Sequence, residues 1–255
     1  MADKNILRIG TLLTFLGLVT LVVGTIYHAA HADPGDSPAA FQDYASSDPW
    51  IAAHLGQFIG TILILSAMVT LYQFMARTGQ PSGVALLMRL GLVGVIATVA
   101  VFGLLQAVDG VTLKFAADQW AAAPDSEKAV AFRVAEAVRW TEIGIHSYFR
   151  IIIGLTLMLY GMGIAWATGF PRWSRWFAAA TVLIGVAQMI DGVGVGYHGF
   201  STPATPPMLW TTVSIFVGPL FLLWGLALAV FLWRQANPAA PSRGSVLRVA
   251  AERGL

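Results

Sequence analysis

The sequence contains no cysteine. This absence excludes disulfide bonds, thiol nucleophiles, iron–sulfur clusters and thiolate zinc sites. Any metal ion that this chain binds must therefore be held by histidine nitrogens and by oxygen ligands.

Charged side chains are also scarce, at 11% of the 255 residues, whereas a soluble domain carries about 25%. Hydrophobic residues make up 57% of the chain, and the mean hydropathy is +0.71. The formal net charge is only +2, and the sequence has no long basic run of the kind that binds nucleic acid. We therefore expect an integral membrane protein whose partner is the lipid bilayer, with no nucleic acid as a ligand.

Long apolar runs are what the sequence does contain. A bilayer core of about 30 Å requires a helix of roughly 20 apolar residues. Six charge-poor runs of about this length lie at residues 9–27, 50–75, 86–108, 140–166, 176–190 and 209–233. Turn-forming residues separate them, and no boundary of a second domain is visible. The sequence predicts an all-α fold in which residues 1–255 form a single bundle of six transmembrane helices.

The segment at residues 125–139 differs from these runs. Val130, Val134 and Val138 recur in it at helical spacing, opposite the charged residues Lys128, Arg133, Glu136 and Arg139. We predict an amphipathic, extracytoplasmic extension of the fourth span, because the combined helix would be too long for the bilayer.

The charges also predict a direction. Cytoplasmic loops carry an excess of Lys and Arg. With the N-terminus in the cytoplasm, ten basic residues lie on the inner side, namely Lys4, Arg8, Arg77, Arg89, Arg172, Arg175, Arg234, Arg243, Arg248 and Arg253. Asp3 and Glu252 are then the only acidic residues on that side. We predict a multi-pass protein of a bacterial plasma (inner) membrane with both termini in the cytoplasm.

In this orientation all five histidines fall on the outer side, at positions 28, 31, 54, 146 and 198. Asp109, Glu142 and Asp191 lie at a similar depth. An ionisable group inside a membrane segment costs at least about 2.5–3.5 kcal/mol, so such groups face the bundle interior and mark function. The sequence therefore predicts a polar cluster open to the outer face.

Two spans end in the same short pattern, Gln106-Ala-Val-Asp109-Gly110 and Gln188-Met-Ile-Asp191-Gly192. In each case a histidine, His54 or His146, lies on the preceding span. This recurrence favours an internal duplication in which the second and third spans, and the fourth and fifth, form parallel hairpins around one axis. Aspartate followed by glycine is also ordinary chemistry for the end of a helix.

We interpret the cluster as a metal centre. Its predicted ligands are His54, His146, His198, Asp109 and Asp191, a set that suits a divalent zinc, iron, manganese or copper ion. Further contacts to the cofactor or substrate are assigned to His28, Gln57, Gln106 and Gln188.

Glu142, His146 and Arg150 recur every four residues and so share one helix face. In this hypothesis Glu142 transfers protons, while Arg150 orients an anion or keeps Glu142 ionised. The predicted function is a metal-dependent membrane enzyme, hydrolytic or oxidative, acting on a lipophilic or small substrate.

Other interpretations stay open. Helix-end histidines can lie at the lipid headgroups, and the carboxylates can cap loops or pair with Arg139 and Arg150. One outward-facing haem is a less favoured cofactor, because all the histidines lie at one depth. A small-solute or proton-coupled transporter, or an accessory subunit of a larger membrane complex, could use the same cluster, and the sequence also allows a homo-oligomer. ATP-driven and nicotinamide chemistry have no motif to support them.

Overall fold

The structure is a computed structural model that describes residues 2–28, 32–200 and 208–237. These residues form helices and short connections, and no strand occurs among them. The expectation of an all-α protein is confirmed.

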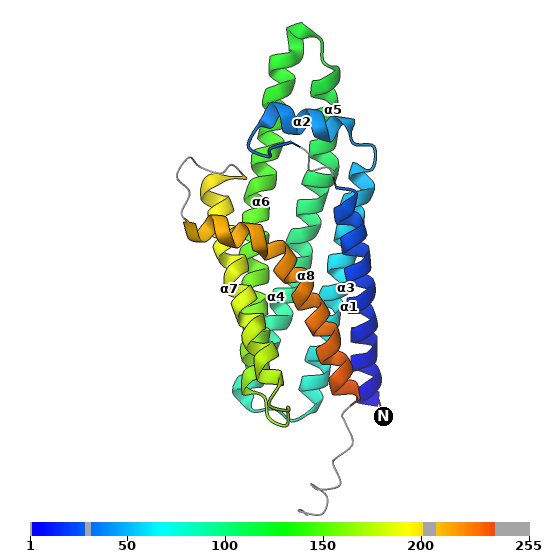
Figure 1. Ribbon diagram of the computed structural model, residues 1–255, viewed down its shortest axis with the longest axis vertical. Helices are drawn as coiled ribbons and strands as arrows, with labels where there is room; N and C mark the ends of the chain where they lie inside the picture. The colour runs from blue at the N-terminus through cyan, green and yellow to red at the C-terminus, as the bar shows by residue number, and fades with distance from the viewer. Residues whose placement is uncertain (1, 29–31, 201–207, 238–255) are drawn as a thin grey trace, which may run out of the picture.

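Six of the helices in the described ranges are long and apolar enough to cross a membrane. They are α1 (Ala2–Ile26), α3 (Trp50–Arg77), α4 (Ser82–Ala107), α6 (Asp125–Trp166), α7 (Ser174–His198) and α8 (Met208–Ala236). The helices run along a common axis, and α8 crosses the others obliquely, so that α1 begins and α8 ends at the same end of the bundle (Figure 1). The predicted multi-pass bundle of six helices is confirmed.

Reciprocal glycine contacts bring two pairs of these helices close together. A Cβ atom added to Gly154 of α6 would lie 2.5 Å from the carbonyl oxygen of Gly185 of α7, and one added to Gly185 would lie 2.6 Å from the carbonyl oxygen of Gly154. Gly17 of α1 and Gly60 of α3 have the same relationship, at 2.7 Å in both directions. Small residues allow such close backbone approach, which is how membrane helices gain packing energy.

A head of helices projects beyond one end of the bundle. Helix α6 has 42 residues and is therefore about 63 Å long, about twice the thickness of the hydrocarbon core. Its outer half packs with α2 (Ser37–Ser46) and α5 (Lys114–Ala122), and a π-helical segment, η1 (Val108–Leu113), joins α4 to α5. The valine stripe of the predicted extension faces this packing only at Val138, which is partly buried against it, because Val130 and Val134 are exposed.

Neither α2 nor the continuation of the third span was predicted, and the start of α2 has a local cause. The side chain of Asp36 accepts a hydrogen bond from the amide of Ala39, and Pro38 lies in the first turn, so α2 has a stable start. Phe41 of α2 is completely buried among Trp120 and Phe132, with ring centroids 6.0 and 5.7 Å away.

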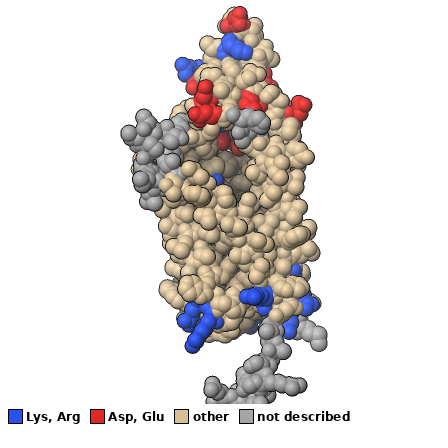
Figure 2. Space-filling model, viewed as in Figure 1, with Lys and Arg blue, Asp and Glu red and all other residues tan. Residues whose placement is uncertain are grey.

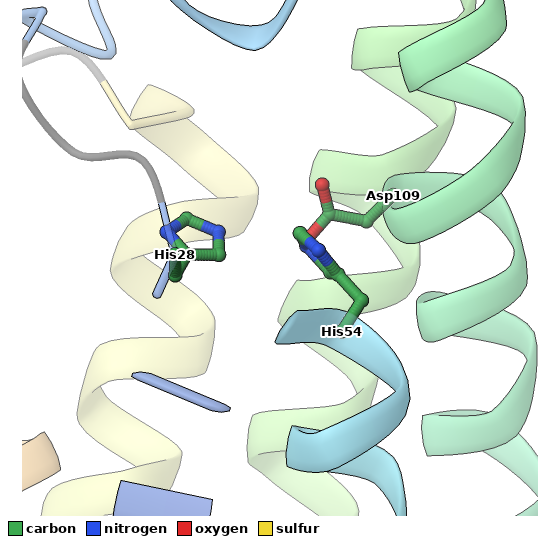
Figure 3. A group of neighbouring side chains, drawn as sticks. All are labelled: His28, His54 and Asp109. Carbon is green, nitrogen blue, oxygen red and sulfur yellow. The ribbon is translucent and has the colours of Figure 1, made fainter. Parts of the chain in front are cut away.

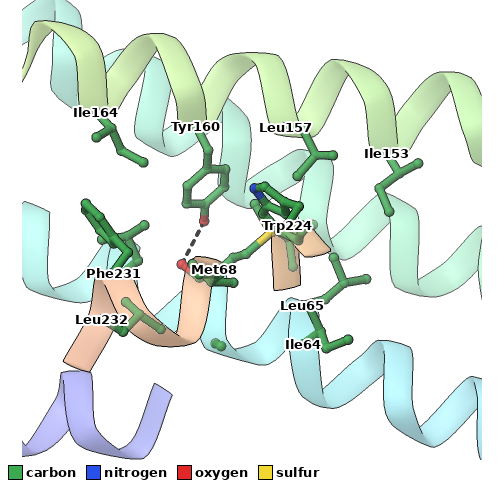
Figure 4. Close-up of a cluster of buried hydrophobic side chains, with 14 of the residues drawn as sticks. Ile64, Leu65, Met68, Ile153, Leu157, Tyr160, Ile164, Trp224, Phe231 and Leu232 are labelled. Atoms are coloured by element: carbon green, nitrogen blue, oxygen red, sulfur yellow. Dashed lines mark hydrogen bonds between the residues drawn. The ribbon is translucent and has the colours of Figure 1, made fainter. Parts of the chain in front are cut away.

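The inner half of the bundle is filled by hydrophobic side chains (Figure 4). Within this core the hydroxyl of Tyr160 donates a hydrogen bond of 3.0 Å to the carbonyl oxygen of Met68. The indole Nε1 of Trp224 donates to Oγ1 of Thr181 at 3.0 Å. These two hydrogen bonds satisfy buried polar groups of α6 and α8 within a hydrophobic core.

Charges separate along the bundle axis. Basic side chains gather at the end where α1 begins and α8 ends, acidic side chains dominate the head, and an uncharged belt lies between them (Figure 2). Large apolar side chains are exposed along the helices, for example Leu12, Ile96 and Leu183 at 57, 63 and 69%. Such a belt is what contact with lipid requires.

Candidate functional site

A cavity of about 580 Å³ lies between the helices on the head side of the bundle. Figure 2 shows a hollow on this face, below the charged head, with acidic and basic atoms visible inside it. The charged and strongly polar side chains that line the cavity are His28, Gln57, Gln106, Asp109, Arg139, Glu142, His146, Arg150 and Gln188. Much of the remaining wall is apolar, with Leu21, Phe102, Leu105, Phe149, Ile153, Phe221 and Leu222.

Three of the polar residues form a compact group. His28 follows the end of α1, His54 lies in the second turn of α3, and Asp109 lies in η1. One ligand atom from each lies within 4.8 Å of the others, and the three side chains point toward a common space (Figure 3). Two imidazoles and a carboxylate form a donor set for transition metals.

A hydrogen bond on the side of the ring away from Asp109 fixes the orientation of His54. Its Nδ1 atom lies 2.8 Å from the carbonyl oxygen of Trp50, so the Nδ1–H donates to that carbonyl. The other nitrogen, Nε2, faces Oδ2 of Asp109 at 3.0 Å, and this buried atom has no hydrogen-bond partner within the described residues. Metal-binding histidines characteristically donate their second ring N–H to a carbonyl or carboxylate in this way.

Aromatic side chains support the group on one side. The ring centroid of Trp50 lies 4.9 Å from that of His28, 4.5 Å from that of His54 and 4.4 Å from that of Tyr44. The Trp50 indole also donates a hydrogen bond of 3.1 Å to the carbonyl oxygen of Asp109. Trp50 is 1% exposed, so these contacts restrict both imidazoles and the backbone that carries the carboxylate.

The prediction that the two Gln-x-x-Asp-Gly patterns end their helices is wrong. The chain stays helical through Gly110 into α5, and through Gly192 to His198. A Cβ atom at Gly110 would lie 2.5 Å from Cβ of His54, and one at Gly192 would lie 2.8 Å from Cβ of Arg150. Each glycine therefore allows a neighbouring helix to approach with a polar site residue.

A second polar pair lies at the head side of the cavity. Nη1 of Arg139 is 3.5 Å from Oε2 of Glu142, and both side chains are buried. Arg139 also donates hydrogen bonds to the hydroxyl of Tyr44 and to the carbonyl oxygen of Pro34, the latter at 3.1 Å. Burial raises the pKa of Tyr44 to about 12, although the positive charge of Arg139 opposes this rise.

A third group is centred on Arg150. Its Nε donates to Nε2 of His146 at 3.0 Å and lies 3.3 Å from Oδ2 of Asp191, while its Nη1 donates to Oε1 of Gln188 at 2.7 Å. Asp191 also accepts a hydrogen bond of 2.6 Å from Ser214 of α8. Because Nε2 of His146 accepts from Arg150, the neutral ring carries its proton on Nδ1.

The structure brings most of the predicted site residues together around the cavity. His28, Gln57, Gln106, Asp109, Glu142, His146, Arg150 and Gln188 line it. His54 and Asp191 adjoin it through their contacts with Asp109 and Arg150. His198 is exposed at the end of α7 and is not among the lining residues.

The predicted ligands fall into different groups. His54 and Asp109 belong to the compact group with His28, whereas His146 and Asp191 flank the guanidinium of Arg150. Arg150 therefore pairs with Asp191, and Glu142 pairs with Arg139.

Sequence reasoning missed the supporting role of Trp50 and Tyr44. A tryptophan at the start of a span is typical of the membrane interface, and nothing local distinguishes Trp50 from such a residue. The N-cap of α2 was the available signal for Tyr44, since Asp36 followed by Pro38 indicates a helix start that would place Tyr44 on an ordered element.

Comparisons with protein-family models, with curated proteins and with solved structures find no match to this chain. The functional assignment therefore depends on the site itself.

Proposed function

We propose that this chain is a metal-dependent membrane enzyme that acts on a lipophilic or small substrate in an outward-facing cavity, by hydrolytic or oxidative chemistry. The observation that carries the proposal is the convergence of His28, His54 and Asp109, with ligand atoms within 4.8 Å of one another, beside a cavity of about 580 Å³. Zinc, iron, manganese and copper ions all accept such ligands.

The number of ligands favours catalysis over a purely structural role. Structural zinc sites use four protein ligands, whereas catalytic sites use three and keep a position for water or substrate. His28, His54 and Asp109 supply three, and Asp109 itself faces the cavity. A bound metal ion would supply Lewis-acid chemistry or an activated water at that wall.

The balance of charge around the cavity also favours a cation. Three carboxylates, those of Asp109, Glu142 and Asp191, accompany the two guanidinium groups of Arg139 and Arg150. One negative charge is therefore unbalanced when all three carboxylates are ionised and the imidazoles are neutral. Charges buried in a protein are normally paired or coordinate a metal, and a divalent ion at Asp109 would remove this imbalance.

Two further residues have proposed roles in the reaction. Glu142 is a proton-transfer group, because its buried Oε2 atom makes no hydrogen bond to the described residues and its side chain faces the cavity. Arg150 positions His146 through the 3.0 Å hydrogen bond between them, which presents Nδ1–H as a donor.

The distribution of charge supports an orientation. The basic end of the bundle lies opposite the acidic head (Figure 2). By the positive-inside rule the basic end faces the cytoplasm, where both termini lie, and the cavity opens on the outer side of the plasma membrane.

Metal content tests the proposal. Protein purified in detergent is loaded separately with zinc, iron(II), manganese and copper, washed, and analysed by mass spectrometry of the elements. The wild type should retain about one equivalent of one of these metals, and His54→Ala should retain less than about a tenth. His198→Ala is the matched control, because His198 lies outside the cavity lining, and it should bind like the wild type. Less than a tenth of an equivalent in the wild type for every metal would refute the proposal.

A transporter is the second candidate, favoured by one observation. Gly218 and Pro219 of α8 line the cavity, and proline within a helix removes a backbone hydrogen bond and kinks the helix. Helices broken near the middle of the membrane form the substrate sites of many transporters, and α8 carries its proline at the cavity while it stays helical from Met208 to Ala236. Uptake of a solute into proteoliposomes that Arg150→Gln abolishes would support this candidate, whereas metal binding without uptake would support the enzyme.

A further inference from the structure

We propose that the cavity binds an amphiphile with an apolar body and an uncharged or cationic head that donates hydrogen bonds: an alcohol, a phenol or an amine. The inference rests on the proposed function in that it names the substrate class of the same site. Binding of the amphiphile itself, however, uses protein groups that are present with or without a metal ion.

Buried acceptor atoms at the cavity point to a donor on the ligand. Oε1 of Gln106 and Oε2 of Glu142 are buried and make no hydrogen bond in the described part of the chain, while Oε2 of Glu142 lies 3.5 Å from Nη1 of Arg139. The two residues are 9 and 3% exposed, and both line the cavity. A buried polar atom without a partner costs about 1–3 kcal/mol. An amine head has enough N–H donors for both oxygens, and a hydroxyl head has one O–H donor for either of them.

The two guanidinium groups at the cavity are already paired, which argues against an anionic head. Arg139 donates to Tyr44 and Pro34 and lies beside Glu142. Arg150 likewise donates to His146 and Gln188 and pairs with Asp191. A carboxylate or phosphate would have to displace one of these partners, and it would add negative charge to a site whose carboxylates already outnumber its guanidinium groups.

The rest of the wall suits an apolar body. Leu21 of α1, Phe102 of α4, Phe149 of α6, and Phe221 and Leu222 of α8 all line the same cavity. Ligand sites typically combine such an apolar lining with a few placed polar groups, in cavities of about 300–1,000 Å³. The hollow adjoins the uncharged belt of the bundle (Figure 2), so a molecule dissolved in the outer leaflet can reach it.

Photolabelling tests this inference. The probes are four dodecyl chains that carry a diazirine near the chain end and differ only in the head: hydroxyl, amine, methyl ether or carboxylate. Each is irradiated with the full-length protein in phosphatidylcholine nanodiscs, with and without a chelator, and labelled residues are identified by peptide mass spectrometry. Labelling of the cavity wall around Phe149 and Leu222 should be about tenfold stronger with the hydroxyl and amine heads than with the methyl ether and carboxylate heads. The reason is that one hydrogen bond to a charged group is worth about 1.5–3 kcal/mol.

Variants separate cavity binding from labelling at the lipid surface. A Cβ atom added at Gly218 meets nothing within 4 Å, so a side chain can start there, and Gly218→Trp should occupy part of the cavity and lower the hydroxyl-probe labelling about tenfold. Gly144→Trp is the matched control, because Gly144 is equally open but does not line the cavity. Gln106→Met keeps the volume, removes an unpartnered acceptor, and should weaken the preference for hydroxyl over ether.

The outcomes are distinct from those of the metal test. Preferential labelling in chelated protein supports the amphiphile site even if metal loading fails. Equal labelling by all four heads, or labelling that Gly218→Trp leaves unchanged, overturns the inference whatever the metal content.

Discussion

Nε2 of His54 lies 3.0 Å from Oδ2 of Asp109, while Nδ1 of the same ring donates to the carbonyl oxygen of Trp50. In a neutral imidazole the proton is therefore on Nδ1, and the two atoms that face each other both carry lone pairs. Such an arrangement needs a positive charge between them, either a proton or a metal ion. Two ligands of a tetrahedral metal, each about 2.0–2.1 Å from it, are about 3.3 Å apart, so a metal ion requires only a small adjustment.

The first prediction concerns this carboxylate. Asp109→Asn removes the charge and one strong ligand with almost no change in volume. Since loss of an outer-shell partner alone lowers metal affinity about 10–100-fold, we expect at least about a 100-fold loss here, measured by competition with a chromophoric chelator. Asp118→Asn is the control, because Asp118 pairs with Lys114 in the head. Unchanged affinity in Asp109→Asn would place the metal elsewhere.

A second prediction concerns the ion pair between Arg150 and Asp191. Asp191→Asn leaves the Arg150 guanidinium without its negative partner in a largely buried site, and we expect a loss of about 3–5 kcal/mol in unfolding free energy. Asp118→Asn breaks a pair whose carboxylate is 40% exposed and should cost at most about 1 kcal/mol. Reversible unfolding in mixed micelles measures both. Equal losses would mean that the contact between Arg150 and Asp191 contributes little.

Helix packing gives a third prediction. Gly185→Ala places a methyl group 2.6 Å from the carbonyl oxygen of Gly154, so α6 and α7 must separate, at a cost of about 1–3 kcal/mol. Gly144→Ala, on the open side of α6, meets nothing within 4 Å and should be neutral or stabilising, because alanine is the better helix former. The unfolding temperature should therefore fall in Gly185→Ala and stay the same or rise in Gly144→Ala. An equal fall in both variants would contradict the packing.

The fourth prediction is a pH dependence. The folded-state pKa of Tyr44 is about 12, above the value of about 10 for an exposed tyrosine. Folding thus favours the neutral phenol, so this contribution to stability is complete below pH 10 and is lost as the pH rises toward 12. Tyr44→Phe should lose less thermal stability than the wild type between pH 10 and 12. Tyr148→Phe, at a position that is 67% exposed, should follow the wild type, and identical profiles for all three would contradict this assignment.

The six-helix bundle could be predicted because hydrophobic length alone determines which segments cross a bilayer. The helical continuation of the chain after Asp109 could not be predicted, since aspartate followed by glycine usually marks a helix end. Here Gly110 is instead required by the approach of His54, a tertiary constraint that leaves no local signal. The start of α2 did leave a local signal, namely the N-cap Asp36 followed by Pro38 in the first turn.

The residues around the cavity could be predicted as a group, because polar side chains in apolar helices face the interior. Their pairing could not be predicted. His28 meets His54 through the packing of α1 on α3, and Arg150 lies between His146 and Asp191, and neither arrangement follows from the spacing of residues along one helix. That these groups hold a metal stays a prediction, as does the internal duplication.

Anomalous X-ray diffraction tests the central claim most directly. Data from metal-loaded crystals, collected on both sides of the absorption edge of the bound metal, should show one anomalous peak between His28, His54 and Asp109, about 2.0–2.2 Å from a ligand atom of each. A strong peak at another place in the chain, or no peak from protein loaded with each of the four metals, would contradict the account.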